Sequence, residues 1–146
     1  MKIMVINGPS LNMLGIREKE VYGSASYGDL VRFIEESAAR LGVQVQVLQS
    51  NHEGQIIDWL QQAFFEGFGG VVINPGAYTH TSIAIADAIR SIAPLPVVEV
   101  HLSDIDARED YRKVSYCAPF CVAQIKGQGF AGYLQAIEKL QKETIL

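Results

Sequence analysis

Five short apolar runs of strand type alternate along the chain with segments whose apolar residues recur at helical spacing. The runs are Ile3–Asn7, Val43–Gln49, Gly70–Asn74, Pro96–Val100 and Pro119–Ile125. Strands that alternate with helices form one parallel sheet with helices on both faces, because each helix carries the chain back across a face of the sheet. The pattern therefore predicts an α/β fold, organised as a single domain over residues 1–146.

The position of each strand in the sheet depends on which of its faces are apolar. Val43, Val45 and Val47 alternate with glutamines, whereas the run Gly70–Asn74 is apolar almost throughout. A strand with one polar face suits a less buried position, so we expect the second strand to lie at an edge. The predicted order along the sheet is 2-1-3-4-5.

The segments between the runs carry the signals of helix ends. Ser26 can cap the first helix, and Gly42 can stop it. In the second helix, Phe64 is expected on the inner face with the aliphatic residues. The helices are predicted over residues 26–41, 50–67, 81–92 and 129–142, with a short charged helical turn over Asp104–Arg112.

Composition and charge narrow the range of partners. The 146 residues are 49% hydrophobic and 19% charged, which is sufficient for the core of one domain. The formal net charge of −4 argues against nucleic acid or an anionic membrane as the main partner. The first strand lacks the features of a signal peptide, and no apolar run approaches the ~20 residues that span a bilayer. We therefore expect a small-molecule ligand, with neither nucleic acid nor membrane as a partner.

Two cysteines, Cys117 and Cys121, stand four residues apart in the region of the predicted fifth strand. Four residues along one strand is too far for a disulfide, and two thiols alone do not form a zinc site. We expect both to be buried, small apolar residues of a protein that works in the reducing cytoplasm.

The segment Val71–Ser82 joins an apolar strand to a cluster of polar side chains. Asn74 ends the strand, Pro75 and Gly76 force a turn, and the polar run Tyr78–Ser82 follows. Buried parallel strands release their polar residues at their carboxyl ends, where ligands bind in the crevice beyond the sheet. Since the fourth strand also ends in polar residues, we expect these groups to converge on one site, as in an enzyme.

Glu99 and His101 stand two apart near the carboxyl end of the fourth strand, so strand alternation places them on the same face. A carboxylate beside an imidazole fixes its tautomer and favours its protonated form, which gives a general acid near neutral pH. The alternative is a histidine that is hydrogen-bonded in the core. Asn74, at the end of the adjacent strand, could hydrogen-bond His101 or a substrate oxygen.

Further binding candidates follow the third and fourth strands. His80 precedes a helix start, where backbone N–H groups attract a carboxylate, although it could equally cap that helix. Arg108 and Arg112 stand four apart and should share a face of the short helical turn. One of them could hold a substrate carboxylate. The alternative is a solvated surface in which they pair with Glu109 and Asp110.

The polar loop Ser10–Ser24 is long for a compact domain, and such loops are often functional, for example as lids. It contains Arg17 and Tyr22. A free tyrosine is a poor base at neutral pH unless a cation favours its phenolate form, and Arg17 could supply that cation. The alternative is that Tyr22 only packs within the loop.

Six strings of the sequence, INGPSLNMLG, REKEVYG, QSNHEGQIIDWL, INPGAYTHTSIAIADAI, VVEVHLSDIDAREDYR and GYLQAIEKL, together resemble one known family. The family is the type II 3-dehydroquinate dehydratases, and the resemblance covers nearly the whole chain. It implies a flavodoxin-like subunit that dehydrates 3-dehydroquinate to 3-dehydroshikimate without a metal or organic cofactor. It also implies a homo-oligomer, commonly a dodecamer built from trimers, and a place in the shikimate route to aromatic amino acids or in quinate breakdown.

Carried over by position, the resemblance implies a role for each candidate residue. Tyr22 would be the base that removes a proton beside the ketone, and Arg17 would hold it as phenolate. His101 would be the acid that protonates the departing hydroxyl, oriented by Glu99 and Asn74. The residues implied in substrate binding are Asn74, His80, Leu102, Ser103 and Arg112, with Asp87 at a position that reaches into the site of a neighbouring subunit.

One position departs from the family pattern. The family usually reads Gly-Pro-Asn-Leu in the first loop, where this chain has Gly8, Pro9, Ser10 and Leu11. That asparagine is thought to hold a water against the enolate oxygen, and the shorter Ser10 is expected to reach this water less well. The substitution predicts slower turnover without loss of the activity.

Several alternatives stay open on the sequence alone. The chain could be a non-catalytic binding or regulatory domain of the same fold, or a flavoprotein, which would be coloured. A dehydration through a lysine Schiff base would have Lys126 as its candidate. The histidines at positions 52, 80 and 101 could in principle share a metal, but their spacing does not require one. We therefore expect no metal.

Overall fold

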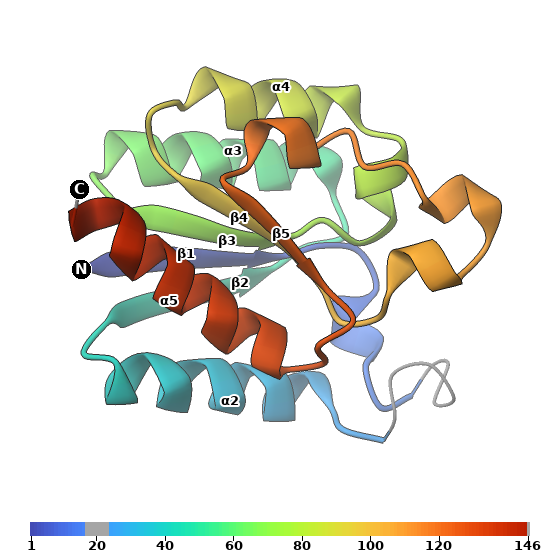
Figure 1. The fold of residues 1–146 in the computed structure, drawn as a ribbon, viewed down its shortest axis with the longest axis horizontal. Helices are drawn as coiled ribbons and strands as arrows, with labels where there is room; N and C mark the ends of the chain where they lie inside the picture. Colours follow the sequence, from blue (N-terminus) through green and yellow to red (C-terminus); the bar gives the residue numbers. More distant parts are fainter. Residues whose placement is uncertain (17–23, 146) are drawn as a thin grey trace.

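A five-stranded parallel sheet runs through the middle of the molecule, with helices on both faces (Figure 1). The computed structural model describes residues 1–16 and 24–145. The strands are β1 (Lys2–Asn7), β2 (Gln44–Gln49), β3 (Gly70–Asn74), β4 (Val97–His101) and β5 (Ala123–Lys126). Their order in the sheet is β2-β1-β3-β4-β5. This confirms the predicted α/β fold and the order 2-1-3-4-5, with β2 at an edge.

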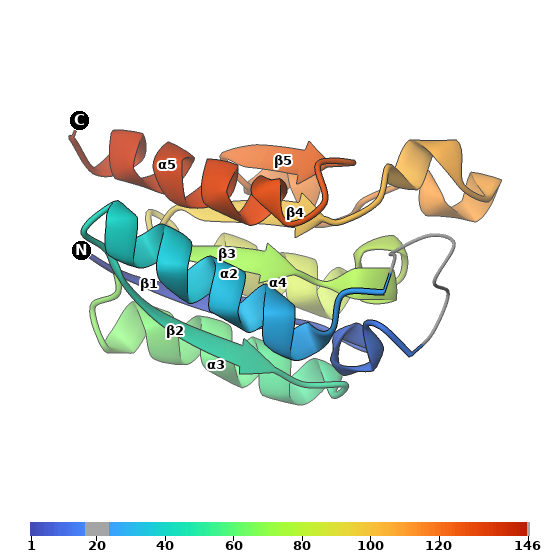
Figure 2. The same ribbon diagram turned by 90° about the horizontal axis from the view of Figure 1, so that it is seen from below.

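The two faces of the sheet are covered by different pairs of helices (Figures 1 and 2). In β1, Ile3 and Val5 pack into the core beneath α2 and α5, whereas Met4 and Ile6 pack into the core beneath α3 and α4. Successive side chains of a strand point to opposite faces, so a strand buried on both faces must be apolar throughout. The helices are α2 (Tyr27–Arg40), α3 (Glu53–Phe65), α4 (Ile83–Ser91) and α5 (Ala131–Ile145).

The first helix, α2, begins and ends where its sequence predicts. The Ser26 hydroxyl accepts from the backbone N–H of Asp29 at 3.1 Å, and the Asp29 carboxylate accepts from the N–H of Ser26 at 2.9 Å. This capping box satisfies backbone donors that no helical turn can reach. Gly42 follows the helix with a φ of 70°, a conformation that favours glycine.

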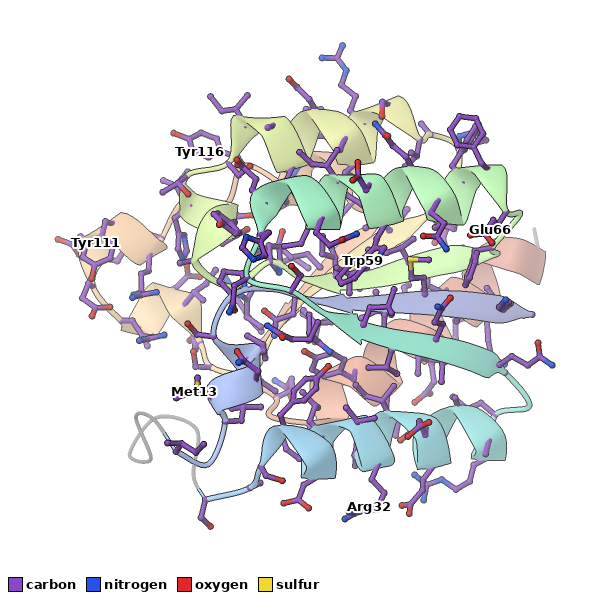
Figure 3. All side chains as sticks on the ribbon, turned by 180° about the vertical axis from the view of Figure 1, so that it is seen from behind. Met13, Arg32, Trp59, Glu66, Tyr111 and Tyr116 are labelled. Carbon is purple, nitrogen blue, oxygen red and sulfur yellow. The ribbon has the colours of Figure 1, made fainter. Side chains whose placement is uncertain are left out.

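The inner face of α3 differs from the prediction at its last turn. Its buried residues are Ile56, Leu60 and Ala63, and the half-buried Trp59 packs beside them (Figure 3). Because Ala63 takes the inward position, the next residue is turned toward solvent, and Phe64 is 44% exposed. The expectation that Phe64 faces the core is wrong.

The last strand, β5, is shorter than expected. The predicted strand began at Pro119, but that residue lies in the 3-10 turn η5 (Ala118–Phe120), and β5 starts only at Ala123. Proline has no backbone N–H for the ladder, so the chain enters the sheet after it. Cys117 and Cys121 therefore flank a turn instead of lying along a strand. Cys117 is buried and Cys121 is half-buried, and both are free thiols.

Four 3-10 turns gather at the carboxyl ends of the strands (Figure 2). They are η1 (Leu11–Met13), η2 (Gly76–His80), η3 (Ile105–Ala107) and η4 (Asp110–Arg112), so the predicted charged helical turn is two separate turns. The Gly8 N–H donates to the carbonyl of Asn74 at 2.7 Å. A Cβ at Gly8 would lie 2.7 Å from the carbonyl oxygen of Pro75, so glycine allows the segments after β1 and β3 to meet.

Among the described residues, no helix is both long and apolar enough to span a bilayer.

Candidate active site

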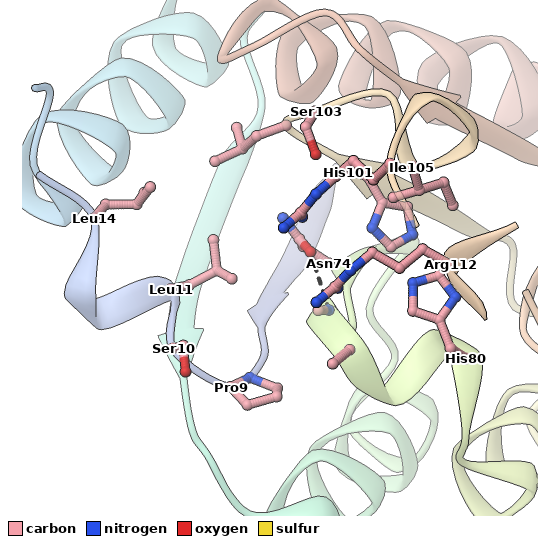
Figure 4. Close-up of a pocket in the computed structure, with 14 residues that line it drawn as sticks. Pro9, Ser10, Leu11, Leu14, Asn74, His80, His101, Ser103, Ile105 and Arg112 are labelled. Atoms are coloured by element: carbon pink, nitrogen blue, oxygen red, sulfur yellow. Dashed lines mark hydrogen bonds between the residues drawn. The ribbon is translucent and has the colours of Figure 1, made fainter. Parts of the chain in front are cut away.

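A cavity of about 250 Å³ opens where β1, β3 and β4 end (Figure 4). Its walls come from the turn after β1, from η2 after β3, and from the segment that follows β4. The cavity thus lies where polar groups were expected to converge, at the carboxyl edge of the sheet. The predicted site residues that line it are Ser10, Asn74, His80, His101, Leu102, Ser103 and Arg112.

His101 and Glu99 form a buried pair at the carboxyl end of β4. The two side chains share a face, and His101 Nε2 lies 2.5 Å from a Glu99 carboxylate oxygen. An ionised carboxylate only accepts hydrogen bonds, so Nε2 carries a proton in this contact. The other ring nitrogen, Nδ1, is left for a ligand in the cavity, and this is where an acid would release its proton.

The Glu99 carboxylate is fully buried and is surrounded by hydrogen-bond donors. Thr79 donates at 2.8 Å, Ser115 at 2.8 Å and Gln124 at 3.1 Å, in addition to His101. Burial raises the pKa of Glu99, but the hydrogen bond and charge of His101, with the bonds from Gln124 and Thr79, outweigh it. The net pKa lies below its usual value, so the carboxylate is ionised at neutral pH.

His80 lies beside His101, with the ring centroids 6.5 Å apart and the planes at 19°. Its Nδ1 is 2.7 Å from the carbonyl oxygen of Val114. A carbonyl can only accept, so Nδ1 carries the proton and Nε2 of a neutral His80 is a hydrogen-bond acceptor. His80 does not cap α4, because Ser82 does so through its hydroxyl at 2.9 Å from the N–H of Ile85.

The side-chain amide of Asn74 is held by two contacts at the end of β3. Its Oδ1 accepts from the N–H of Gly76 at 3.1 Å, and its Nδ2 donates to the hydroxyl of Tyr133 at 2.9 Å. The expected hydrogen bond from Asn74 to His101 is not among the contacts of these described residues. Tyr133 was missed in the sequence, where only its neighbours on α5 carried a core signal.

Arg108 and Arg112 both line the cavity, although Arg108 follows η3 and Arg112 ends η4. Arg112 Nε donates to the Glu109 carboxylate at 2.7 Å, and Arg108 Nε lies 3.9 Å from the same group. Guanidinium groups bind carboxylates through paired N–H donors. The cavity can therefore hold an anionic ligand on this side.

Ser10 lies at the rim of the cavity in a left-handed backbone conformation, with a φ of 69°. Its N–H donates to the side-chain oxygen of Asn51 at 2.9 Å, and Gln49 donates to the carbonyl of Gly8 at 3.1 Å. These contacts, from the last residue of β2 and from the segment that follows it, fix the turn. Serine adopts this conformation less readily than asparagine or glycine.

Among the described residues, two predicted site residues do not line the cavity, Glu99 and Asp87; Glu99 is buried beside His101. Asp87 lies on the exposed side of α4. Arg17 and Tyr22 lie outside the described residues. Within residues 1–16 and 24–145, no group of three or more His, Cys, Asp or Glu side chains is placed to hold a metal ion.

Residues 1–141 match the family model of class II dehydroquinase. The 3-dehydroquinate dehydratase of Clostridium acetobutylicum is 56% identical over 141 residues, which make up 97% of this chain and 96% of that protein. The crystal structure of the type II dehydroquinase from Butyrivibrio crossotus has a TM-score of 0.95 at 52% identity, covering 97% of each chain. That of the Propionibacterium acnes enzyme has a TM-score of 0.92 at 39% identity, covering 97% of this chain and 96% of the other.

Proposed function

The chain belongs to the class II dehydroquinase family, and on this basis we propose that it dehydrates 3-dehydroquinate to 3-dehydroshikimate in the shikimate pathway. The observation that carries the proposal is the His101–Glu99 pair, whose His101 lines a cavity together with Arg108 and Arg112. Loss of water beta to a ketone needs a base for the carbon acid, stabilisation of the enolate and an acid for the leaving hydroxyl.

The reaction proceeds in two proton transfers. Tyr22, held as phenolate by Arg17, takes the proton from the carbon beside the ketone, and the C–H electron pair forms the enolate. The enolate then collapses, the carbon–carbon double bond forms, and the bond to the beta hydroxyl breaks. His101 gives a proton to that hydroxyl, which leaves as water. Solvent returns the proton from Tyr22 to His101, so the cycle closes without a cofactor.

The substrate carboxylate and hydroxyls are matched by the groups that line the cavity. Arg112 and the segment Leu102–Ser103 bind the carboxylate end, where the guanidinium supplies charge. His80 accepts a hydrogen bond from a substrate hydroxyl through Nε2, since its Nδ1 donates to Val114. Asn74 donates to a substrate oxygen.

The assembly is proposed as a dodecamer built from trimers, in which Asp87 reaches a neighbouring site. Its exposure on α4 leaves it available for such a contact. Light scattering on the purified protein measures the mass of the assembly. A monomer at working concentration would contradict this part of the proposal.

Direct assay of dehydration is the experiment that tests the proposed function. Adding 3-dehydroquinate is expected to raise the ultraviolet absorbance, because the product is a conjugated enone. Quinate is the matched control: a hydroxyl replaces its ketone, so the neighbouring C–H is not acidic and the absorbance should stay constant. No rise with 3-dehydroquinate from folded protein would overturn the proposal.

A Schiff-base route is separated from the enolate route by borohydride. Lys126 is paired with the carboxylate of Asp106 and does not line the cavity, which argues against its attack on the substrate. Borohydride added during turnover is therefore expected to leave no substrate-derived mass on the protein. Covalent labelling would support a lysine instead.

Restoring the family's asparagine at position 10 is expected to raise kcat. The amide would hold the water that supports the enolate, and loss of such a transition-state hydrogen bond can cost on the order of 3 kcal/mol. Because Ser10 retains a hydroxyl, we expect a gain of roughly ten- to a hundredfold in Ser10→Asn.

Ser10→Gly is the matched control, because glycine relieves the left-handed backbone without adding an amide. Equal gains in kcat from Gly and Asn would assign the effect to the backbone. An unchanged kcat in Ser10→Asn would show that Ser10 already serves this role.

A further inference from the structure

The amide side chains that end β1 and β3 meet a single buried hydroxyl. Asn7 and Asn74 are paired in the parallel register of these two strands, and both are buried. Between them lies Tyr133 of α5, whose side chain is fully buried. Its hydroxyl is 2.6 Å from Asn7 Oδ1 and 2.9 Å from Asn74 Nδ2. The three polar groups thus satisfy one another at the base of the cavity.

One backbone group fixes the direction of the hydrogen bonds that link Asn74, Tyr133 and Asn7. The N–H of Gly76 can only donate, so the Asn74 atom that faces it at 3.1 Å is the carbonyl oxygen. The amide nitrogen of Asn74 must then face Tyr133 and donate to it. The Tyr133 hydroxyl accepts that bond and gives its own proton to Asn7, and Asn7 Nδ2 faces the Tyr27 hydroxyl at 3.4 Å.

Burial reinforces this direction at Tyr133. Desolvation raises the pKa of the Tyr133 hydroxyl well above its usual value. The hydroxyl therefore keeps its proton, and that proton is committed to Asn7. Tyr133 can present only an acceptor to Asn74, so the amide of Asn74 cannot turn over without placing its oxygen against the Tyr133 oxygen.

We propose that Tyr133 is a positioning residue for the reaction, and that it acts by locking the side-chain amide of Asn74. Asn74 lines the cavity, with one amide hydrogen on Tyr133 and its oxygen on Gly76. The second amide hydrogen is left for an oxygen of the ligand. Asn74 is thereby specified as a donor toward the substrate, and this inference rests on the proposed function of the cavity.

Removing the Tyr133 hydroxyl releases the lock. In Tyr133→Phe, Asn74 loses the acceptor that holds its nitrogen and can rotate or turn over. One oriented hydrogen bond to the substrate is then lost, which is expected to lower kcat/KM roughly tenfold. The loss should appear mainly in KM, because Asn74 binds an oxygen that the substrate already has before the reaction.

A double-mutant cycle tests whether Tyr133 acts through Asn74. In the Asn74→Ala background, Tyr133→Phe is expected to change kcat/KM by less than about twofold, because the group it positions is gone. Tyr27→Phe is the matched control, because Tyr27 contacts Asn7 at the other end of these linked hydrogen bonds; it should leave kcat/KM within about twofold of the wild type. Circular dichroism and Tm monitor folding in every variant.

Two results would overturn the proposal. One is an unchanged kcat/KM in folded Tyr133→Phe. The other is the same loss in the wild-type and Asn74→Ala backgrounds, which would indicate general destabilisation. Should Tyr133→Phe fail to fold, Asn7→Ser removes the acceptor of the Tyr133 proton in its place. It is expected to lower kcat/KM in the wild type and not in Asn74→Ala, and equal effects in both would again be contrary.

A binding measurement separates this inference from the proposed function. If the wild type does not convert 3-dehydroquinate, the proposed function fails by itself. Calorimetry with quinate as the probe then applies the same cycle to the cavity. Weaker binding of quinate in Tyr133→Phe that disappears in the Asn74→Ala background supports the lock. Equal binding by wild type and Tyr133→Phe contradicts it.

Discussion

Replacing His101 by alanine is expected to lower kcat for the dehydration by about 10²- to 10⁴-fold, the range that general acids contribute. The His101 side chain is only 5% exposed and is held by Glu99. Among the described residues that line the cavity, no other acid occupies the position of His101. Without it, the hydroxyl must leave as hydroxide or take its proton from water. Steady-state kinetics with 3-dehydroquinate measure the change, and Tm shows whether the fold is kept.

His80→Ala is the matched control for His101→Ala. His80 has the same ring, lines the same cavity and lies parallel to His101, but it contacts Val114 instead of a carboxylate. We expect its loss to raise KM more than it lowers kcat, because its proposed role is to bind a hydroxyl of the substrate. A larger fall in kcat for His80→Ala than for His101→Ala would reverse the two assignments. Tyr22→Phe is expected to match the loss in His101→Ala, since it removes the proposed base.

Glu99→Gln is expected to lower kcat by up to about 10⁴-fold, as when an amide replaces the carboxylate that orients a catalytic histidine. The amide carries no negative charge beside the His101 ring. It also brings an NH₂ group among donors from Thr79, Ser115 and Gln124, which need an acceptor. Each donor left without a partner destabilises the fold by about 1–3 kcal/mol. Chemical denaturation measures that second effect.

The same substitution is expected to change how stability depends on pH. In the folded state the pKa of Glu99 lies below its usual value of 4.5. Its carboxylate therefore stabilises the fold above about pH 4.5, and that contribution is lost as the pH falls through the lowered folded value. The Gln variant should lack this component of acid destabilisation.

Ser115→Ala is the graded control for Glu99→Gln. It removes one donor and keeps the carboxylate charge, so kcat should fall by less than tenfold, since a net hydrogen bond contributes only about 1 kcal/mol. A Glu99→Gln protein with wild-type kcat and an unchanged pH dependence of its stability would show that Glu99 serves packing alone.

The strand order and the end of the sheet that holds the cavity could be predicted because they depend on local patterns. The alternation in β2 placed it at an edge, and the polar residues after β3 and β4 marked the carboxyl edge. Phe64 was misplaced because helical spacing defines a face only to within about a residue, and Ala63 already fills the inward position. The strand β5 is shorter than predicted because Pro119 has no backbone N–H to donate to the sheet, and an apolar run does not compensate for this.

The pair of Glu99 and His101 could be predicted, but the other donors to Glu99 and the Tyr133 partner of Asn74 could not, because they come from distant parts of the chain. Tyr133 meets Asn74 across 59 residues and Asn7 across 126. Nothing in the spacing of a tyrosine on a helix indicates which strand end its hydroxyl reaches. The roles assigned to Tyr22 and Arg17 stay predictions, as do those of the residues that line the cavity.

The buried thiol of Cys117, beside the Glu99 carboxylate, can report on the opening of this part of the structure. Burial, and after it the negative charge of Glu99, raises the pKa of Cys117 to about 12, so almost no thiolate exists in the folded protein at neutral pH. An alkylating reagent can attack Cys117 only when the η5 segment opens. The rate at which Cys117 is alkylated therefore measures how often this segment opens, without any probe having to be attached.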